Sequence, residues 1–120
     1  MIAIRGAVQI ERDTTEAIAA GVRELCRTIA AENALSPDDI VSAIFTLTPD
    51  LRASFPAKAA RDEGWSDVPM ICAQELDVPG ALSRVCRVLL HVDRDRASSS
   101  PRHVYLGGAR VLRPDLAGAR

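Results

Sequence analysis

A single long amphipathic helix is the feature that most constrains how this chain can fold. Between residues 14 and 33, apolar side chains recur every three or four residues and charged side chains occupy the opposite side. Asp13 and Glu16 stand three residues apart, a spacing typical of a helix start. One apolar stripe can cover only one face of a sheet, so the pattern predicts a sheet with a second, uncovered face. The stripe consists of Ile18, Val22, Leu25 and Ile29.

The rest of the chain is dominated by alternating segments rich in Val and Ile, which predict β-strands. A short helix is expected at residues 57–61, and Gly107 and Gly108 are expected to bend or bulge the last strand. The sequence therefore predicts an α+β fold, in which one long and one short helix pack on a five-stranded, mostly mixed sheet. The expected strands cover residues 2–10, 40–48, 68–76, 84–93 and 103–112.

The length of 120 residues predicts one domain. We expect residues 1–116 to form this domain and residues 117–120 to be a flexible C-terminal tail. The composition of residues 97–101 predicts a mobile loop. The uncovered face of the sheet needs a partner, and the simplest partner is another copy of the chain.

The net charge and the cysteines indicate which partners the protein has and in which compartment it works. Its formal net charge of −1 argues against nucleic acid as a partner, because phosphate binding needs a basic excess. Three cysteines without a CxxC pair favour free thiols in a reducing compartment. We find no signal-peptide pattern and no apolar run near the roughly 20 residues of a membrane span. We therefore expect a cytoplasmic protein that binds neither membrane nor nucleic acid.

The sequence lacks the common catalytic motifs. It contains no GxSxG nucleophile motif and no phosphate-binding GxxxxGK(S/T) loop. His91 and His103 have no His, Cys or acidic neighbour at metal-ligand spacing, so we expect no zinc site. His91 shares strand parity with Arg87 and could lie near a site, although a structural histidine is the simpler interpretation.

Four charged residues interrupt or end apolar strands, namely Arg5, Glu75, Arg87 and Arg113. A buried charge is costly unless it is paired. These residues therefore form structural ion pairs, face the solvent, or bind a ligand. Three arginines against one glutamate leave a surplus of positive charge, which suits a ligand with carboxylates.

Six ordered segments, together with an opening IRGA at residues 4–7 and ERDT at 11–14, resemble one known family. They resemble the monofunctional chorismate mutases of the trimeric, pseudo-α/β-barrel type (the AroH class). The resemblance runs from about residue 2 to 116, which makes it far more specific than any single motif. The segments are TPDL at 48–51, FPAKAAR at 55–61, CAQELDV at 72–78, CRV at 86–88, HVYL at 103–106 and VLRPDL at 111–116.

The resemblance implies the conversion of chorismate to prephenate, a branch step toward phenylalanine and tyrosine. This Claisen rearrangement breaks an ether C–O bond as a C–C bond forms, and it needs no nucleophile, metal or cofactor. The family also implies a homotrimer with active sites between neighbouring subunits, so that the sheet and helices assemble as a trimeric pseudo-α/β barrel.

The resemblance also assigns roles to residues of this chain. Arg87 is expected to stabilise charge on the ether oxygen, and Glu75 to accept a hydrogen bond from the substrate hydroxyl. Arg5 and Tyr105 are expected to bind substrate carboxylates, with the Tyr105 hydroxyl within reach of Arg5. The pocket would be lined by Ile71, Cys72, Ala73 and Gln74 in one strand. The other expected substrate-binding residues are Phe55, Ala57, Lys58 and Arg61 in a mobile cap, and Leu112 and Arg113 near the C-terminus.

Two other interpretations stay open at this point. The first is a different enzyme on a similar trimeric architecture, such as the small imine/enamine deaminases, which would not require Glu75 and Arg87 in these contexts. The second is a catalytically silent anion-binding or regulatory module. One departure from the family pattern is Ile71, at a position often held by threonine, which removes one possible hydroxyl contact.

Overall fold

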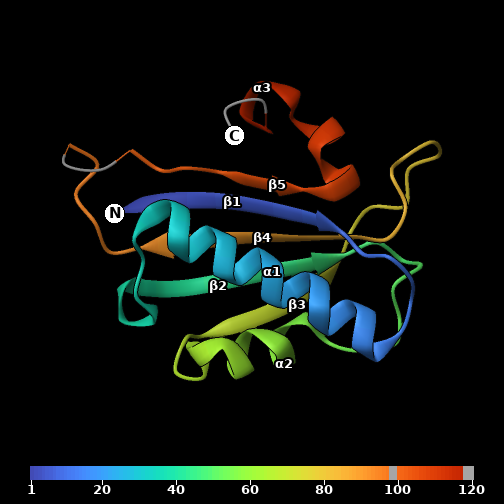
Figure 1. Cartoon of the computed structure of the whole chain (residues 1–120), viewed down its shortest axis with the longest axis horizontal. Coiled ribbons are helices and arrows are strands. Elements are labelled where there is room, and N and C mark those ends of the chain that lie inside the picture. Colours follow the sequence, from blue (N-terminus) through green and yellow to red (C-terminus); the bar gives the residue numbers. More distant parts are fainter. Residues whose placement is uncertain (98–99, 118–120) are drawn as a thin grey trace.

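A five-stranded sheet carries one long helix diagonally across one of its faces (Figure 1). The computed structural model describes residues 1–97 and 100–117. The elements are β1 (Ile2–Gln9), α1 (Thr15–Asn33), the short turn η1 (Pro37–Asp39), β2 (Ile40–Leu47), α2 (Pro56–Ala60), η2 (Arg61–Trp65), β3 (Met70–Gln74), β4 (Val85–Val92), β5 (Val104–Leu106), η3 (Gly107–Leu112) and α3 (Pro114–Ala117).

The sheet has the strand order β3-β2-β4-β1-β5 and is mixed. The central strand β4 pairs antiparallel with both β1 and β2, while β3 and β5 lie at the two edges and pair in parallel with β2 and β1. The predicted α+β architecture with a mixed five-stranded sheet is confirmed. The expected strand at residues 68–76 is shorter, since Pro69 has no N–H to donate and β3 begins only at Met70.

Helix α1 begins one residue later than Asp13 and Glu16 suggested. Thr14 is the N-cap, and its hydroxyl accepts a hydrogen bond from the Ala17 N–H at 3.1 Å. The Asp13 carboxylate instead accepts hydrogen bonds from the backbone N–H groups of Arg52 and Ala53, at 2.8 and 2.9 Å. The predicted helix start at Asp13 is therefore wrong by one residue, because the Asp13 side chain binds a distant loop instead of capping the helix.

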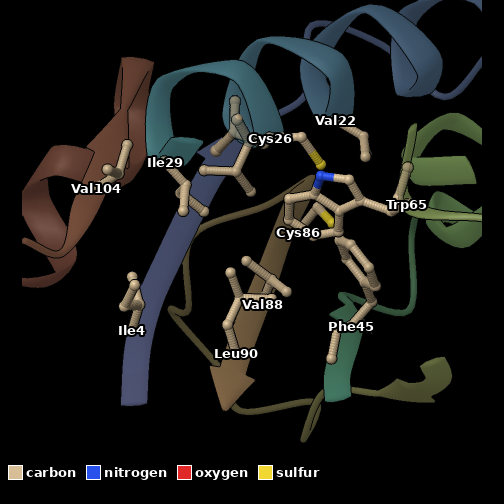
Figure 2. Close-up of a cluster of buried hydrophobic side chains, with 14 of the residues drawn as sticks. Ile4, Val22, Cys26, Ile29, Phe45, Trp65, Cys86, Val88, Leu90 and Val104 are labelled. Carbon is tan, nitrogen blue, oxygen red and sulfur yellow. The ribbon is translucent and has the colours of Figure 1, made fainter. Parts of the chain in front are cut away.

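The predicted apolar stripe of α1 is confirmed, and it packs on the sheet to form the main core. Its residues are buried against alternate side chains of β1, β2 and β4, and Phe45 and Trp65 close the core beside α2 (Figure 2). Gly6 allows the close approach of helix and sheet. A Cβ on Gly6 would lie 2.7 Å from Ile29 Cδ1, closer than packed carbon atoms tolerate.

The segment after β5 differs from its prediction. The expected strand at residues 103–112 ends at Leu106, and residues 107–112 form the 3-10 turn η3. The expected bend or bulge at Gly107 and Gly108 takes the form of a strand end, because Gly107 has a positive φ of 58° and starts this turn. Pro114–Ala117 then form α3, which includes the first residue of the predicted flexible tail, while residues 118–120 lie outside the described residues.

Turn η3 covers one end of the sheet face opposite α1. A small second cluster forms there from Ala7, Val85, Tyr105 and Ala109. The remainder of this face has no helix from the described chain over it, and its edge residue Ile71 is 63% exposed. The short helix expected at 57–61 is confirmed as α2, and the chain turns after it at Gly64, where φ is 94°.

Candidate active site

The centre of the candidate site is an ion pair between Arg87 and Glu75. Arg87 is in the middle of β4 on the face away from α1, because its neighbours Cys86 and Val88 point into the main core. Glu75 follows β3 directly, and its backbone N–H donates to the Leu47 carbonyl at 2.8 Å. The Arg87 Nε lies 3.5 Å from Glu75 Oε2, with the side chains 44% and 24% exposed. Two of the predicted residues are thus brought together from the end of β3 and from β4, the two strands that flank β2.

A third group in this centre is the hydroxyl of Thr46, which sequence reasoning missed. Thr46 pairs with Arg87 across β2 and β4, so both side chains leave the same face of the sheet. Its hydroxyl donates a hydrogen bond to Glu75 Oε2. The available signal was parity, because polar Thr46 alternates along β2 with the apolar residues Phe45 and Leu47.

Arg5 lies on the same face, one strand further along. It pairs with Leu89, which is two residues from Arg87 on β4, so the two arginines are diagonal neighbours. The Arg5 side chain is exposed, and its backbone N–H donates to His103 Nδ1 at 3.0 Å. Arg5 and Arg87 therefore give this face two arginines on adjacent strands.

Tyr105 and Arg113 flank that face at its β5 edge. Tyr105 is only 4% exposed and belongs to the small cluster under η3. The described structure contains no hydrogen bond between its hydroxyl and Arg5, and the expected reach of the hydroxyl toward Arg5 stays a prediction. The Arg113 guanidinium donates two hydrogen bonds to the Asp115 carboxylate, of 3.1 and 2.9 Å. These hydrogen bonds and the negative charge of Asp115 raise the pKa of Arg113. Leu112 packs at the border of the same cluster.

A separate cavity of about 540 Å³ lies at the β3 edge of the sheet. It is lined by the end of β2, the loop that follows it, the start of α2 and strand β3. This cavity gathers predicted residues from the cap and the pocket strand, namely Phe55, Lys58, Cys72, Ala73 and Gln74. Ile71, Ala57 and Arg61 do not line it: Ile71 lies outside it on the open face, Ala57 is buried, and Arg61 is exposed at the start of η2.

The three cysteines differ in their availability for chemistry. Burial raises the pKa of Cys26 to about 12, with a smaller contribution from Glu63, and burial also raises the pKa of Cys86. Both thiols therefore remain protonated near neutral pH and face the core, as Figure 2 shows. Cys72 is exposed at the cavity.

The arrangement suits charge placement better than covalent or metal chemistry. Within residues 1–97 and 100–117, no group of three or more His, Cys, Asp or Glu side chains could hold a metal ion. His91 is bonded to the Ser42 hydroxyl at 3.1 Å, as a structural histidine would be. The described helices include none that is long and apolar enough to cross a membrane. What remains is a surface with two arginines, one oriented carboxylate and a neighbouring cavity.

Comparison with known proteins identifies the chemistry that uses such a surface. Residues 1–116 match the family model for chorismate mutase type I. The chain is 47% identical over 114 residues to chorismate mutase AroH of Bacillus subtilis, covering 94% of this chain and 90% of that protein. It is 46% identical over 118 residues to chorismate mutase AroH of Thermus thermophilus, covering 98% and 97%.

A solved structure agrees with these relatives. The chorismate mutase from Clostridium thermocellum superposes with a TM-score of 0.86 at 45% identity, over 92% of this chain and 99% of that one. These matches set aside both the deaminase-like and the silent-module interpretations. The agreement of family model, relatives and fold shows that this chain belongs to the chorismate mutase type I family, the AroH class, and is an isomerase.

Proposed function

We propose that this chorismate mutase converts chorismate to prephenate at a site built around Arg87 and Glu75. The observation that carries the proposal is the placement of the Arg87 guanidinium and the Glu75 carboxylate on one open sheet face, 3.5 Å apart. The rearrangement moves charge within a single molecule and requires no group that accepts a proton or an electron. Fixed charges at the right positions are therefore sufficient for catalysis.

Arg87 acts on the breaking bond. Its Nε lies 3.5 Å from Glu75 Oε2, and no described residue accepts a hydrogen bond from its terminal nitrogens. These nitrogens are available for the ether oxygen, where negative charge grows in the transition state. Because that charge is smaller in bound chorismate, the interaction lowers the barrier rather than only tightening binding.

Glu75 and Arg5 orient the substrate. Glu75 accepts a hydrogen bond from the substrate hydroxyl and balances positive charge that develops on the ring. Arg5 is exposed on the same face and binds a carboxylate through its planar fork. Holding chorismate in its reactive, folded conformer removes an entropic part of the barrier.

The complete site requires more than one subunit. The cap and pocket residues Phe55, Lys58 and Cys72 are at the β3 edge, whereas Tyr105 and Arg113 are at the β5 side. Four strand spacings of about 4.8 Å separate these edges by roughly 19 Å, too far for one small metabolite to touch both within one protomer. A homotrimer in which the β3 edge of one copy adjoins the open face of the next would join the two groups.

The same open face supports trimer formation. Ile44 and Leu89 are partly exposed in the middle of this face, and Ile71 is exposed beside them. Apolar side chains at these positions gain from being covered by a neighbouring copy. The three cysteines are free, which fits an enzyme that works in the reducing cytoplasm.

The direct test mixes purified protein with chorismate and follows the loss of its ultraviolet absorbance. Prephenate is verified by its acid conversion to phenylpyruvate, and mass is measured in the same buffer. We expect rapid turnover and a trimeric mass. Unchanged chorismate in the presence of a folded trimer would refute the proposed reaction, and a fully active monomer would refute the shared site.

A further inference from the structure

The hydroxyl of Thr46 occupies a position between the two charged groups of the site. The register of the sheet sets Thr46 on β2 beside Ala73 of β3 on one side and Arg87 of β4 on the other. All three side chains therefore leave the face that is not covered by α1. Thr46 is the polar residue of β2 that is nearest to both Glu75 and Arg87 in this register.

The hydrogen bond of Thr46 selects one oxygen of Glu75. The hydroxyl donates to Oε2, and Arg87 Nε approaches this same oxygen at 3.5 Å. No residue in the described ranges donates a hydrogen bond to Oε1. One carboxylate oxygen is thus held by the protein, while no described residue donates a hydrogen bond to the other.

We propose that Thr46 is a positioning residue that holds the Glu75 carboxylate in its working orientation. It fixes Oε2 beside Arg87 and leaves Oε1 directed at the substrate hydroxyl. Thr46 touches neither the substrate nor the reacting atoms. The inference rests on the proposed roles of Glu75 and Arg87, and it adds the residue that determines how these two groups meet.

Glu75 needs such support because of its place in the chain. It lies one residue beyond the end of β3, at the start of the connection to β4, and one backbone bond to Leu47 ties it to the sheet. A glutamate has several rotatable bonds and loses considerable freedom when it is fixed. Thr46 is on an interior strand with neighbours on both sides, so it is a rigid anchor for this side chain.

Ser42 provides a matched comparison on the same strand. It lies four residues before Thr46 and on the same face, and its hydroxyl is bonded to His91 Nδ1 at 3.1 Å. Removal of either hydroxyl deletes one partly buried hydrogen bond from β2. Only the Thr46 bond reaches a proposed catalytic group, so the two deletions separate a general structural effect from a specific one.

The test compares Thr46→Val, Thr46→Ser and Ser42→Ala with the unaltered enzyme. Valine keeps the shape of threonine and its preference for strands, but it cannot donate a hydrogen bond. Loss of a hydrogen bond to a charged group predicts that Thr46→Val lowers kcat about ten- to a hundredfold. We expect KM to change much less, Thr46→Ser to restore most of kcat, and Ser42→Ala to keep it. Should the valine variant fold poorly, Thr46→Ala removes the same hydroxyl.

A double-mutant cycle distinguishes positioning from a structural role. If Thr46 acts through Glu75, then Thr46→Val should change kcat less than about twofold in a Glu75→Ala background. An equal loss in both backgrounds, or a Thr46→Val enzyme with unaltered kcat, would overturn the inference. A fully active Glu75→Ala enzyme would overturn it together with the proposed site. An inactive unaltered enzyme would contradict the proposed function itself.

Discussion

The guanidinium of Arg87 lies 3.5 Å from the carboxylate of Glu75, but neither side chain is enclosed by the protein. Ion pairs with this degree of exposure contribute little to stability, because water screens their attraction. The pair is therefore more important for the charge that it presents to a ligand than for holding the fold together. Loss of either partner should affect catalysis far more than folding.

Replacement of Arg87 by alanine is the first test of that view. The variant loses the donor that we propose for the ether oxygen, and deletion of such a donor typically lowers kcat by about a hundred- to a thousandfold. We expect a smaller effect on KM and almost no change in the thermal unfolding midpoint. Steady-state kinetics and circular dichroism measure all three quantities.

Arg110→Ala is the control for this substitution, because Arg110 is an exposed arginine on η3 with no assigned role. It should behave as the unaltered enzyme does. Equal losses in kcat and in substrate affinity for Arg87→Ala would mean that Arg87 only anchors the substrate. A large drop in the unfolding midpoint would mean that the Arg87–Glu75 pair is structural after all.

Much of the fold could be predicted from the sequence because local patterns determine it. The stripe of α1 and the alternation of β1, β2 and β4 identify which side chains face the main core. The same alternation predicts that Arg5 and Arg87 lie on the opposite face, where the sheet register places both. These features depend on residues close together in the chain, where periodicity carries the information.

Other features depend on contacts between distant segments and could not be predicted in this way. Asp13 holds a loop about forty residues away instead of capping its own helix. Residues 107–112 continue an apolar strand pattern, but they turn at Gly107 because they cover the second cluster around Tyr105. The Thr46–Glu75 bond joins two separate elements, and no spacing in the sequence indicates it.

Gly6 should be intolerant of a larger side chain. A Cβ at this position would lie 2.7 Å from Ile29 Cδ1 and 3.1 Å from Leu25 Cδ1, and both of these side chains are fully buried. Overpacking of this kind typically costs about 1–3 kcal/mol. Gly6→Ala should therefore lower the midpoint of urea denaturation, measured at a fixed protein concentration.

Ile29→Val provides the partner variant for this test, because it removes the Cδ1 atom nearest to the new Cβ. The double variant should be more stable than the sum of the two single losses predicts, since the clash is relieved. Additive losses would show that Gly6 is needed for a reason other than its contact with Ile29.

The buried thiols predict a loss of stability at alkaline pH. Burial raises the pKa of Cys26 from 9.0 to about 12, so the folded protein keeps a proton that the unfolded chain releases. The stabilisation is complete below about pH 9 and is lost as the pH rises toward 12, by at most about 1.4 kcal/mol per pH unit for one thiol. Cys26→Ala should flatten this part of the curve of urea midpoint against pH. Exposed Cys72→Ala should leave it unchanged, and equal slopes for all three proteins would contradict the assignment.

An active site shared between subunits predicts that two inactive variants regain activity when they assemble in the same trimer. Lys58→Glu places a negative charge in the cavity at the β3 edge, where an anionic substrate is expected, and Arg87→Ala disables the open face. Each variant alone should have little activity. In a shared site, one subunit supplies the cavity and a different subunit supplies the open face. In trimers formed by refolding an equal mixture, about one site in four therefore combines an intact cavity with an intact face. We therefore expect recovery of about a quarter of the activity of the unaltered enzyme, with refolded single variants as controls. If instead one subunit supplied both groups, every site would carry one of the two defects, and mixing would restore nothing.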